Sequence, residues 1–264
     1  MNTAEISREI RKRLVRMHCK GSHFGSAMSI VDILTVLYFR IMDISSPEDP
    51  DRDRFLLSKG HSASAWYTTL ARKGFFPDKV LDTYLQDGSQ LCGHPVRGGL
   101  PGVEASTGSL GHGINIAAGI ALAARNDGKG YRAYVLMGDG EVQEGSVWEG
   151  AILAARLKLE NLVAVIDANN LQGFDVVENI QPNSTLPGKW EAFGWGVREV
   201  DGHDHGELEA AFRAAPFRPG SPSVVIAHTT KCKGVKEMEG CFESHYLSVP
   251  EDKVECYCRG LEEE

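Results

Sequence analysis

The residues best suited to hold a ligand form two polar clusters, each placed after a short apolar run. Gly138-Asp139-Gly140 follows the run at 133–137, and Asn169-Asn170 follows the run at 162–167. Short apolar runs bounded by turn residues are typical of buried strands, and residues 146–158 between them have the pattern of a helix. Ligands in such folds bind at the carboxyl edge of the parallel sheet. A right-handed crossover makes the two strands neighbours or near neighbours, so we expect Asp139 and Asn169 to converge.

The donor atoms of these clusters suit a hard cation. Asp139 offers a carboxylate oxygen, Asn169 an amide oxygen and Leu171 a backbone carbonyl. Mg²⁺ takes six oxygen ligands, few of them carboxylates, with phosphate oxygens and water filling the remaining positions. Gly138 and Gly140 leave room for a phosphate to approach the backbone. Gly-Asp-Gly alone is usually an ordinary turn, but the helix and strand supplied by the 28 residues at 141–168 favour a binding site.

The elements that must position these residues change in character near residue 105. The first 100 residues are mainly helical, with loops that carry Gly and His. The expected elements there are helices at 5–18 and 29–42, a loop at 49–55 and a short helix around Leu81. The expected elements beyond the runs named above are a helix at 111–125, a strand near 195–200, a helix near 204–215 and a strand at 223–227. This alternation predicts an α/β fold, a parallel sheet with helices on both faces.

The length and composition limit the number of domains and the classes of partner. A chain of 264 residues, 42% of them hydrophobic, suits one large domain, which we place at 1–250, followed by a polar and mobile C-terminal tail at 251–264. A net charge of −8 without a basic run argues against nucleic acid and against an anionic membrane surface. No apolar stretch is long enough to span a bilayer, and the N-terminus lacks the apolar core of a signal peptide. We therefore expect a cytoplasmic protein.

The six cysteines contain no C-x-x-C pair and do not form the pattern of a disulfide framework, which fits a reducing compartment. Cys241, His245, Cys256 and Cys258 could in principle gather around zinc. The paired spacing typical of structural zinc sites is missing, so ordinary thiols are the preferred interpretation.

Gly138-Asp139-Gly140 followed at this distance by Asn169-Asn170 resembles the cofactor-anchoring motif of thiamine diphosphate enzymes. The resemblance implies the thiamine diphosphate-binding fold. It also implies that Asp139, Asn169 and the carbonyl of Leu171 hold a Mg²⁺ ion that bridges the two phosphates of the cofactor.

Four upstream segments narrow the resemblance to the transketolase family, and they occur in the family's order. They are GSHFGS at 21–26 for the family's GHPGS, SKGH at 58–61 for S-x-G-H, GHP at 93–95, and STGSLGHG at 106–113 for the TGSLG loop. A fifth segment, KCKGV at 231–235 with ESH at 243–245, resembles the family's KGKG and WHG more weakly. Phe24, Ser244 and Tyr246 depart from the family pattern close to the expected substrate path, which bears on the identity of the substrate.

The resemblance implies that His23, His61 and His94 lie over the reactive carbon of the cofactor as catalytic groups. His61 and His94 each follow a glycine directly, and His23 lies two positions from Gly21 and from Gly25. A single histidine in this context is more often a turn or capping residue, but three in family register favour the functional role. Imidazoles that donate or accept protons near neutral pH suit a polyhydroxylated substrate.

The remaining implied roles concern the cofactor. Gly108, Ser109 and Leu110 would face its diphosphate with their backbone amides, just before a helix N-terminus. Glu144 matches a family glutamate near the subunit contact, and its alternative role is that of a solvated carboxylate in the first turn of a helix. His245 would lie close to the phosphates or to the substrate.

Full-length transketolases carry a further domain that binds the aminopyrimidine ring, and this chain has no room for it. The resemblance therefore implies a second subunit carrying the pyrimidine-binding and C-terminal domains, commonly in an α₂β₂ heterotetramer. The implied reaction is transfer of a two-carbon ketol unit from a ketose, expected to be a phosphate, to an aldose. Two alternatives stay open: another thiamine enzyme, such as a deoxyxylulose-phosphate synthase-like or E1α-like chain, and a non-catalytic or regulatory subunit.

Overall fold

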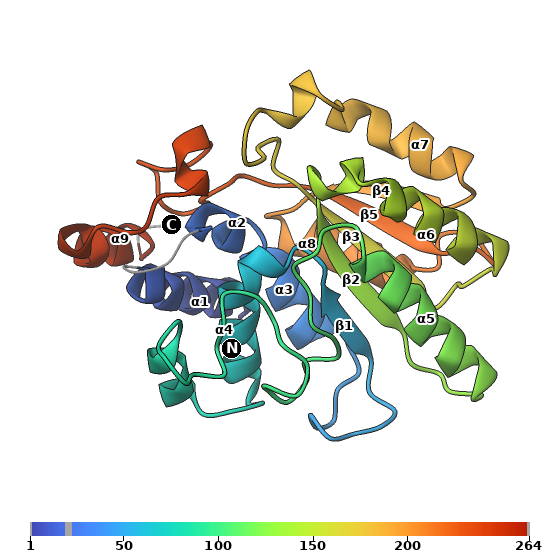
Figure 1. Ribbon diagram of the computed structural model, residues 1–264, viewed down its shortest axis with the longest axis horizontal. Coiled ribbons are helices and arrows are strands. Elements are labelled where there is room, and N and C mark those ends of the chain that lie inside the picture. Colours follow the sequence, from blue (N-terminus) through green and yellow to red (C-terminus); the bar gives the residue numbers. More distant parts are fainter. Residues whose placement is uncertain (1, 19–22, 263–264) are drawn as a thin grey trace.

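In the described part of the chain, residues 2–18 and 23–262 of the computed structural model, five parallel strands form one sheet (Figure 1). Its spatial order is β1-β2-β3-β5-β4. The strands are β1 (Arg54–Leu57), β2 (Ala133–Gly138), β3 (Leu162–Ala168), β4 (Gly196–Asp201) and β5 (Ser223–His228). Strands β2 and β3 are direct neighbours, as the crossover rule predicted for the two polar clusters.

Helices cover both faces of the sheet, which confirms the predicted α/β fold. One face carries α5 (Gly113–Asn126), α6 (Gly145–Arg156) and α7 (Leu186–Ala192) (Figure 1). The other carries α1 (Thr3–Met17), α3 (Val31–Val36), α4 (Ala63–Lys73) and α8 (His205–Ala214), with the short α2 (Phe24–Ser29) beside them. Successive residues of β2 alternate between the two cores: Tyr134 and Leu136 pack on the α1 side, and Val135 and Met137 on the α5 side.

The prediction of a loop at 49–55 is wrong in part, because strand β1 begins at Arg54. Its four residues pair with β2, and Phe55 and Leu56 enter opposite cores. A run this short between charged residues gives almost no periodicity, so only the pairing with β2 reveals the strand. The expected helix at 29–42 is also interrupted at Ile30 and ends as the π-helical turn Leu37–Ile41.

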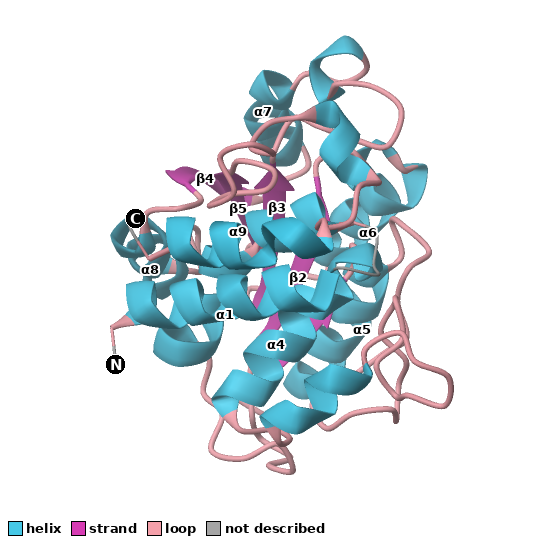
Figure 2. Cartoon of the chain, turned by 90° about the vertical axis from the view of Figure 1, so that its left-hand side faces the viewer, coloured by secondary structure: helices cyan, strands magenta, loops and turns pink. Residues whose placement is uncertain are grey.

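The C-terminal segment differs from the expected mobile tail as well. Residues Val254–Gly260 form helix α9, which lies along α1 (Figure 2). Tyr257, Cys258 and Leu261 are buried in the same core as α1, and the Cys258 thiol approaches the carbonyl of Lys12. These apolar positions have helical spacing, so one face of an otherwise polar segment packs on the domain. None of the described helices has the length and apolar character that a membrane-spanning segment requires.

Candidate functional site

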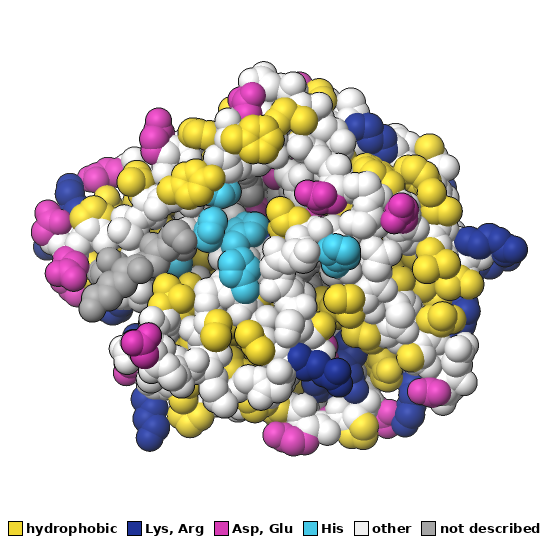
Figure 3. Space-filling view, in the orientation of Figure 1, with side chains coloured by type: hydrophobic (Ala, Val, Ile, Leu, Met, Phe, Trp, Pro, Cys, Tyr) yellow, Lys and Arg dark blue, Asp and Glu magenta, His cyan; other side chains and the backbone are white. Residues whose placement is uncertain are grey.

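A pocket of about 480 Å³ opens at the carboxyl edge of the sheet, where β1, β2 and β3 end. Figure 3 shows histidine side chains gathered around a hollow on this side of the molecule. The predicted site residues that line the pocket are His23, His61, His94, Gly108, Leu110, Gly138, Asp139, Gly140, Glu144, Asn169, Leu171 and His245. Ser109 is exposed and is not among the lining residues. Gly21 and Ser22 of the first motif lie outside the described residues.

Asp139 follows β2 and is 3% exposed. Its carboxylate accepts hydrogen bonds from the amides of Gly140 (2.9 Å) and Asn170 (2.7 Å) and from Nδ2 of Asn183 (2.9 Å). Burial, together with the nearby charge of Asp167, raises the pKa of Asp139 to about 6. No cationic side chain of the described chain forms an ion pair with it, so this buried carboxylate fits a site that receives a metal cation.

The two other predicted metal ligands lie at the end of β3. Nδ2 of Asn169 donates to Asp167 (2.8 Å), while its Oδ1 accepts from the amide of Leu171 (3.1 Å). The carbonyl of Leu171 accepts a hydrogen bond from Nζ of Lys231 (3.2 Å). A carboxylate, an amide oxygen and a carbonyl oxygen are all hard donors, which suits Mg²⁺ better than zinc.

Zinc has no candidate site in the parts of the chain that the structure describes. No three side chains of His, Cys, Asp or Glu gather there as metal ligands. The zinc alternative at Cys241, His245, Cys256 and Cys258 is therefore wrong.

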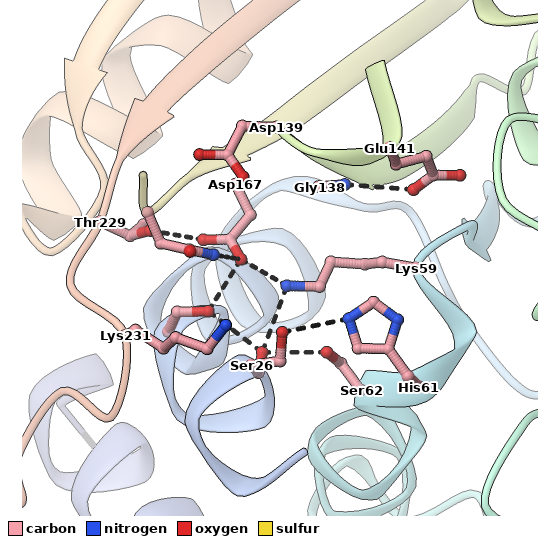
Figure 4. Close-up of polar contacts among 12 residues, drawn as sticks. Ser26, Lys59, His61, Ser62, Gly138, Asp139, Glu141, Asp167, Thr229 and Lys231 are labelled. Carbon is pink, nitrogen blue, oxygen red and sulfur yellow. Dashed lines mark hydrogen bonds and ion pairs between the residues drawn. The ribbon is translucent and has the colours of Figure 1, made fainter. Parts of the chain in front are cut away.

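A buried ion pair between Lys59 and Asp167 supports this edge of the sheet (Figure 4). Lys59 follows β1, and Asp167 is the penultimate residue of β3. Ser29 (2.8 Å) and Thr229 also donate to the Asp167 carboxylate. Burial alone would raise the pKa of Asp167, but Lys59 and these donors hold it below its usual range. The signal for this pair in the sequence is a single aspartate closing an otherwise apolar run.

Three histidines from distant parts of the chain are in contact at the pocket. The ring centroid of His23 lies 5.1 Å from that of His61 and 5.2 Å from that of His245. His61 also shares a hydrogen bond of 3.1 Å between its Nε2 and Oγ of Ser26. His94 packs on Gly108, where an added Cβ would lie 2.7 Å from the imidazole and the φ angle is +137°. Glycine at 108 is therefore what allows His94 to approach the loop.

The surroundings keep this group of histidines uncharged. Burial is the largest cause that lowers the pKa of His23, and the electrostatic effect of His94 is the next largest. Burial, and to a smaller extent the positive charge of Lys59, lowers the pKa of His61 well below its usual range. Burial, and to a smaller extent the positive charge of Lys231, lowers the pKa of His245 to about 3. Neutral imidazoles retain one donor and one acceptor nitrogen each, which suits hydrogen bonding to hydroxyl groups.

The loop before α5 is tied to the Gly-Asp-Gly turn by Glu141, which the sequence did not single out. Its carboxylate accepts hydrogen bonds from the amides of Gly111 (2.9 Å) and Gly138 (3.1 Å). The amide of Gly113, the first residue of α5, donates to Oγ of Ser58 (3.1 Å). Gly108 and Leu110 of this loop line the pocket.

The chain is similar to known proteins over almost its whole length. The family described as "Transketolase, thiamine diphosphate binding domain" matches residues 6–261. One subunit of the apulose-4-phosphate transketolase of Phocaeicola vulgatus is 43% identical over 251 residues, covering 93% of this chain and 89% of that protein. The 6-deoxy-6-sulfo-D-fructose transketolase subunit SqwG of Clostridium sp. is 39% identical over 244 residues, covering 92% and 89%.

Among solved structures, transketolase from Leishmania mexicana superposes with a TM-score of 0.90 at 30% sequence identity. The match covers 99% of this chain and 41% of that chain, so this chain spans less than half of the solved enzyme.

Proposed function

The chain belongs to the transketolase family, and from this premise we propose that it is the diphosphate-binding subunit of a two-chain, thiamine diphosphate-dependent transketolase. The similar proteins that are named as transketolase subunits match this chain over about nine-tenths of their own length, which supports a partner chain. Their names specify transketolases, which favours ketol transfer over the E1α-like, synthase-like and non-catalytic alternatives. The partner would carry the pyrimidine-binding and C-terminal domains in an α₂β₂ assembly in the cytoplasm.

The observation that carries the proposal is the buried carboxylate of Asp139, which has no ion-pair partner in the described chain and lies in a pocket bordered by histidines. We assign Mg²⁺ to Asp139, Asn169 and the carbonyl of Leu171. The amides of Gly108 and Leu110 and the turn Gly138–Gly140 then face the diphosphate. Ser109 would contribute through its backbone alone, and Glu144, which lines the pocket, would act near the contact with the partner subunit.

Thiamine diphosphate supplies the electron sink for cleavage of a bond next to a carbonyl. The protein's own contribution is to orient the sugar and to move protons. His23, His61 and His245 act as neutral hydrogen-bonding groups toward substrate hydroxyls, and His94 completes the set. Donor and acceptor are proposed to be a ketose phosphate and an aldose.

The deciding experiment is purification of the tagged chain with its partner and an assay of ketol transfer with added thiamine diphosphate and Mg²⁺. Activity of the complex, with none from the chain alone, is the expected result. Full turnover by the chain alone would refute the two-chain site. Release of CO₂ from pyruvate by the complex without ketol transfer would favour a decarboxylating thiamine enzyme, and an inert complex would favour the non-catalytic subunit.

A further inference from the structure

Tyr246 links two segments of the pocket wall at the boundary with solvent. The residue follows the short 3-10 turn Phe242–His245, and its hydroxyl donates a 2.9 Å hydrogen bond to the carbonyl of Gly173. Gly173 belongs to the loop after β3, whereas His245 belongs to a segment more than seventy residues later. Both Gly173 and His245 line the pocket, so the hydrogen bond links two segments of its wall that are far apart in the sequence.

The ring of Tyr246 also covers the histidines. Its centroid lies 4.7 Å from that of His245 and 6.3 Å from that of His23, within the range of aromatic contacts. Tyr246 is nevertheless 62% exposed. A side chain that contacts three lining residues on one side and solvent on the other forms the rim of the pocket. Figure 3 shows hydrophobic side chains bordering the hollow beside the histidines.

The contact depends on glycine at position 173. A Cβ added there would lie 2.8 Å from the Tyr246 hydroxyl and 3.5 Å from Nε2 of His245. A side chain at position 173 would displace the Tyr246 hydroxyl, so glycine is what allows this hydroxyl to approach the backbone. The neighbouring Phe174, 76% exposed, extends the apolar rim.

We propose that Tyr246 is a specificity-determining residue that narrows the pocket entrance and so limits the part of a donor ketose beyond its transferred two-carbon unit. This inference rests on the proposed ketol transfer. The predicted metal ligands lie at the strand ends, whereas Tyr246 lies at the solvent boundary beside the histidines. Its ring therefore restricts the part of the substrate beside the histidines and does not contact the predicted metal ligands in the structure.

The kinetic test uses the complex with its partner and compares wild type, Tyr246→Phe and Tyr246→Gly. The measured quantity is kcat/KM for a six-carbon ketose phosphate divided by kcat/KM for hydroxypyruvate, which is a short donor. Tyr246→Gly should raise this ratio by about tenfold, the scale at which pocket shape discriminates substrates. Tyr246→Phe keeps the ring and should stay closer to wild type. Leu247→Ala, at an exposed neighbour that has neither a hydroxyl group nor an aromatic ring, is the matched control. An unchanged ratio in Tyr246→Gly, with active wild type, would overturn the inference.

A second test needs neither activity nor cofactor. Diethyl pyrocarbonate labelling of the isolated chain, read by mass spectrometry, should modify His23 and His245 several-fold faster in Tyr246→Gly than in wild type. His228, which is exposed and outside the pocket, serves as the internal reference. Equal labelling rates would show that Tyr246 does not cover the entrance and would overturn the inference independently. Faster labelling in a chain whose complex transfers no ketol unit would instead retain the narrow entrance and refute the proposed function.

Discussion

Lys59 and Asp167 form an ion pair between the ends of β1 and β3, and both side chains are almost completely buried. The pair connects the edge strand to the strand that bears Asn169, since Asp167 also accepts a hydrogen bond from the Asn169 amide. The charge of Lys59 thus stabilises the residue that orients a predicted metal ligand.

Lys59→Met should destabilise the protein strongly, because it leaves the Asp167 carboxylate buried without its cation. Breaking one partner of a buried pair costs about 3–5 kcal/mol. Urea denaturation gives the free energy of unfolding. Lys129→Met is the matched control, since Lys129 pairs with Asp51 at the surface and its loss should not be measurable. Similar stabilities of the two variants would contradict the structural role of Lys59.

Asp139→Asn should abolish Mg²⁺-dependent binding of thiamine diphosphate in titration calorimetry. The substitution keeps the size and one acceptor oxygen of the side chain but removes the carboxylate charge. The exposed Asp127→Asn should bind like wild type. Unchanged affinity in Asp139→Asn would remove this residue from the proposed metal site.

Asn183→Ala should weaken the affinity for Mg²⁺ by about 10- to 100-fold, the usual effect of removing a group that orients a metal ligand. The Asn183 amide donates to both Asp139 (2.9 Å) and Asn170 (2.7 Å). Asn179→Ala, which loses only an exposed bond to Asp175, is the control for the calorimetric titration. Equal affinities of the two variants would argue that Asp139 needs no support from Asn183.

The stability of the wild-type protein should fall more on acidification than that of His61→Gln. The pKa of His61 lies well below 6.5 in the folded chain, whereas an unfolded histidine titrates near 6.5. Below that pH the unfolded chain binds a proton that the folded chain does not, so acid favours unfolding. Above it both states are neutral and the contribution is constant. Urea midpoints at about pH 7.5 and about pH 5.5 measure the difference. Parallel shifts in the two proteins would contradict the lowered pKa.

Leu261→Ala should lower the free energy of unfolding by about 2–5 kcal/mol, as expected for a buried leucine. Leu261 is 2% exposed in the core shared by α1 and α9. Arg259→Ala, an exposed change in the same helix, should have little effect on the thermal midpoint. Equal midpoints for the two variants would mean that the segment after residue 250 is the mobile tail that its polar composition predicted.

The sequence predicted the parallel sheet, its covered faces and the meeting of the two polar clusters, because apolar runs and glycine turns are local signals. It did not predict β1, because these four residues are recognisable as a strand only from their pairing with β2. The insertion of β5 between β3 and β4 also depends on long-range packing.

Within the site, the supporting roles of Asn183 and Glu141 could not be predicted for a similar reason. Asn183 begins a short 3-10 turn, 44 positions from the carboxylate that it supports, and nothing in its neighbours indicates that contact. Glu141 follows the Gly-Asp-Gly turn like an ordinary surface carboxylate, yet it is buried and binds two backbone amides. Side chains that hydrogen-bond to a site residue from a distant part of the chain produce no recognisable local sequence pattern.

The order of strands also governs when the pocket can form during synthesis. Its walls come from His23 and Ser26 before β1 and from segments after β1, β2, β3 and β5, and His245 follows all five strands of the described sheet. Parallel strands need distant partners, which makes their pairing slow compared with local helices. A nascent chain that ends before β5 lacks one of the two strands that pair with β3 and also lacks Thr229, which donates a hydrogen bond to Asp167. Assembly of the binding edge is therefore a late event, completed only after the residues beyond β5 have left the ribosome.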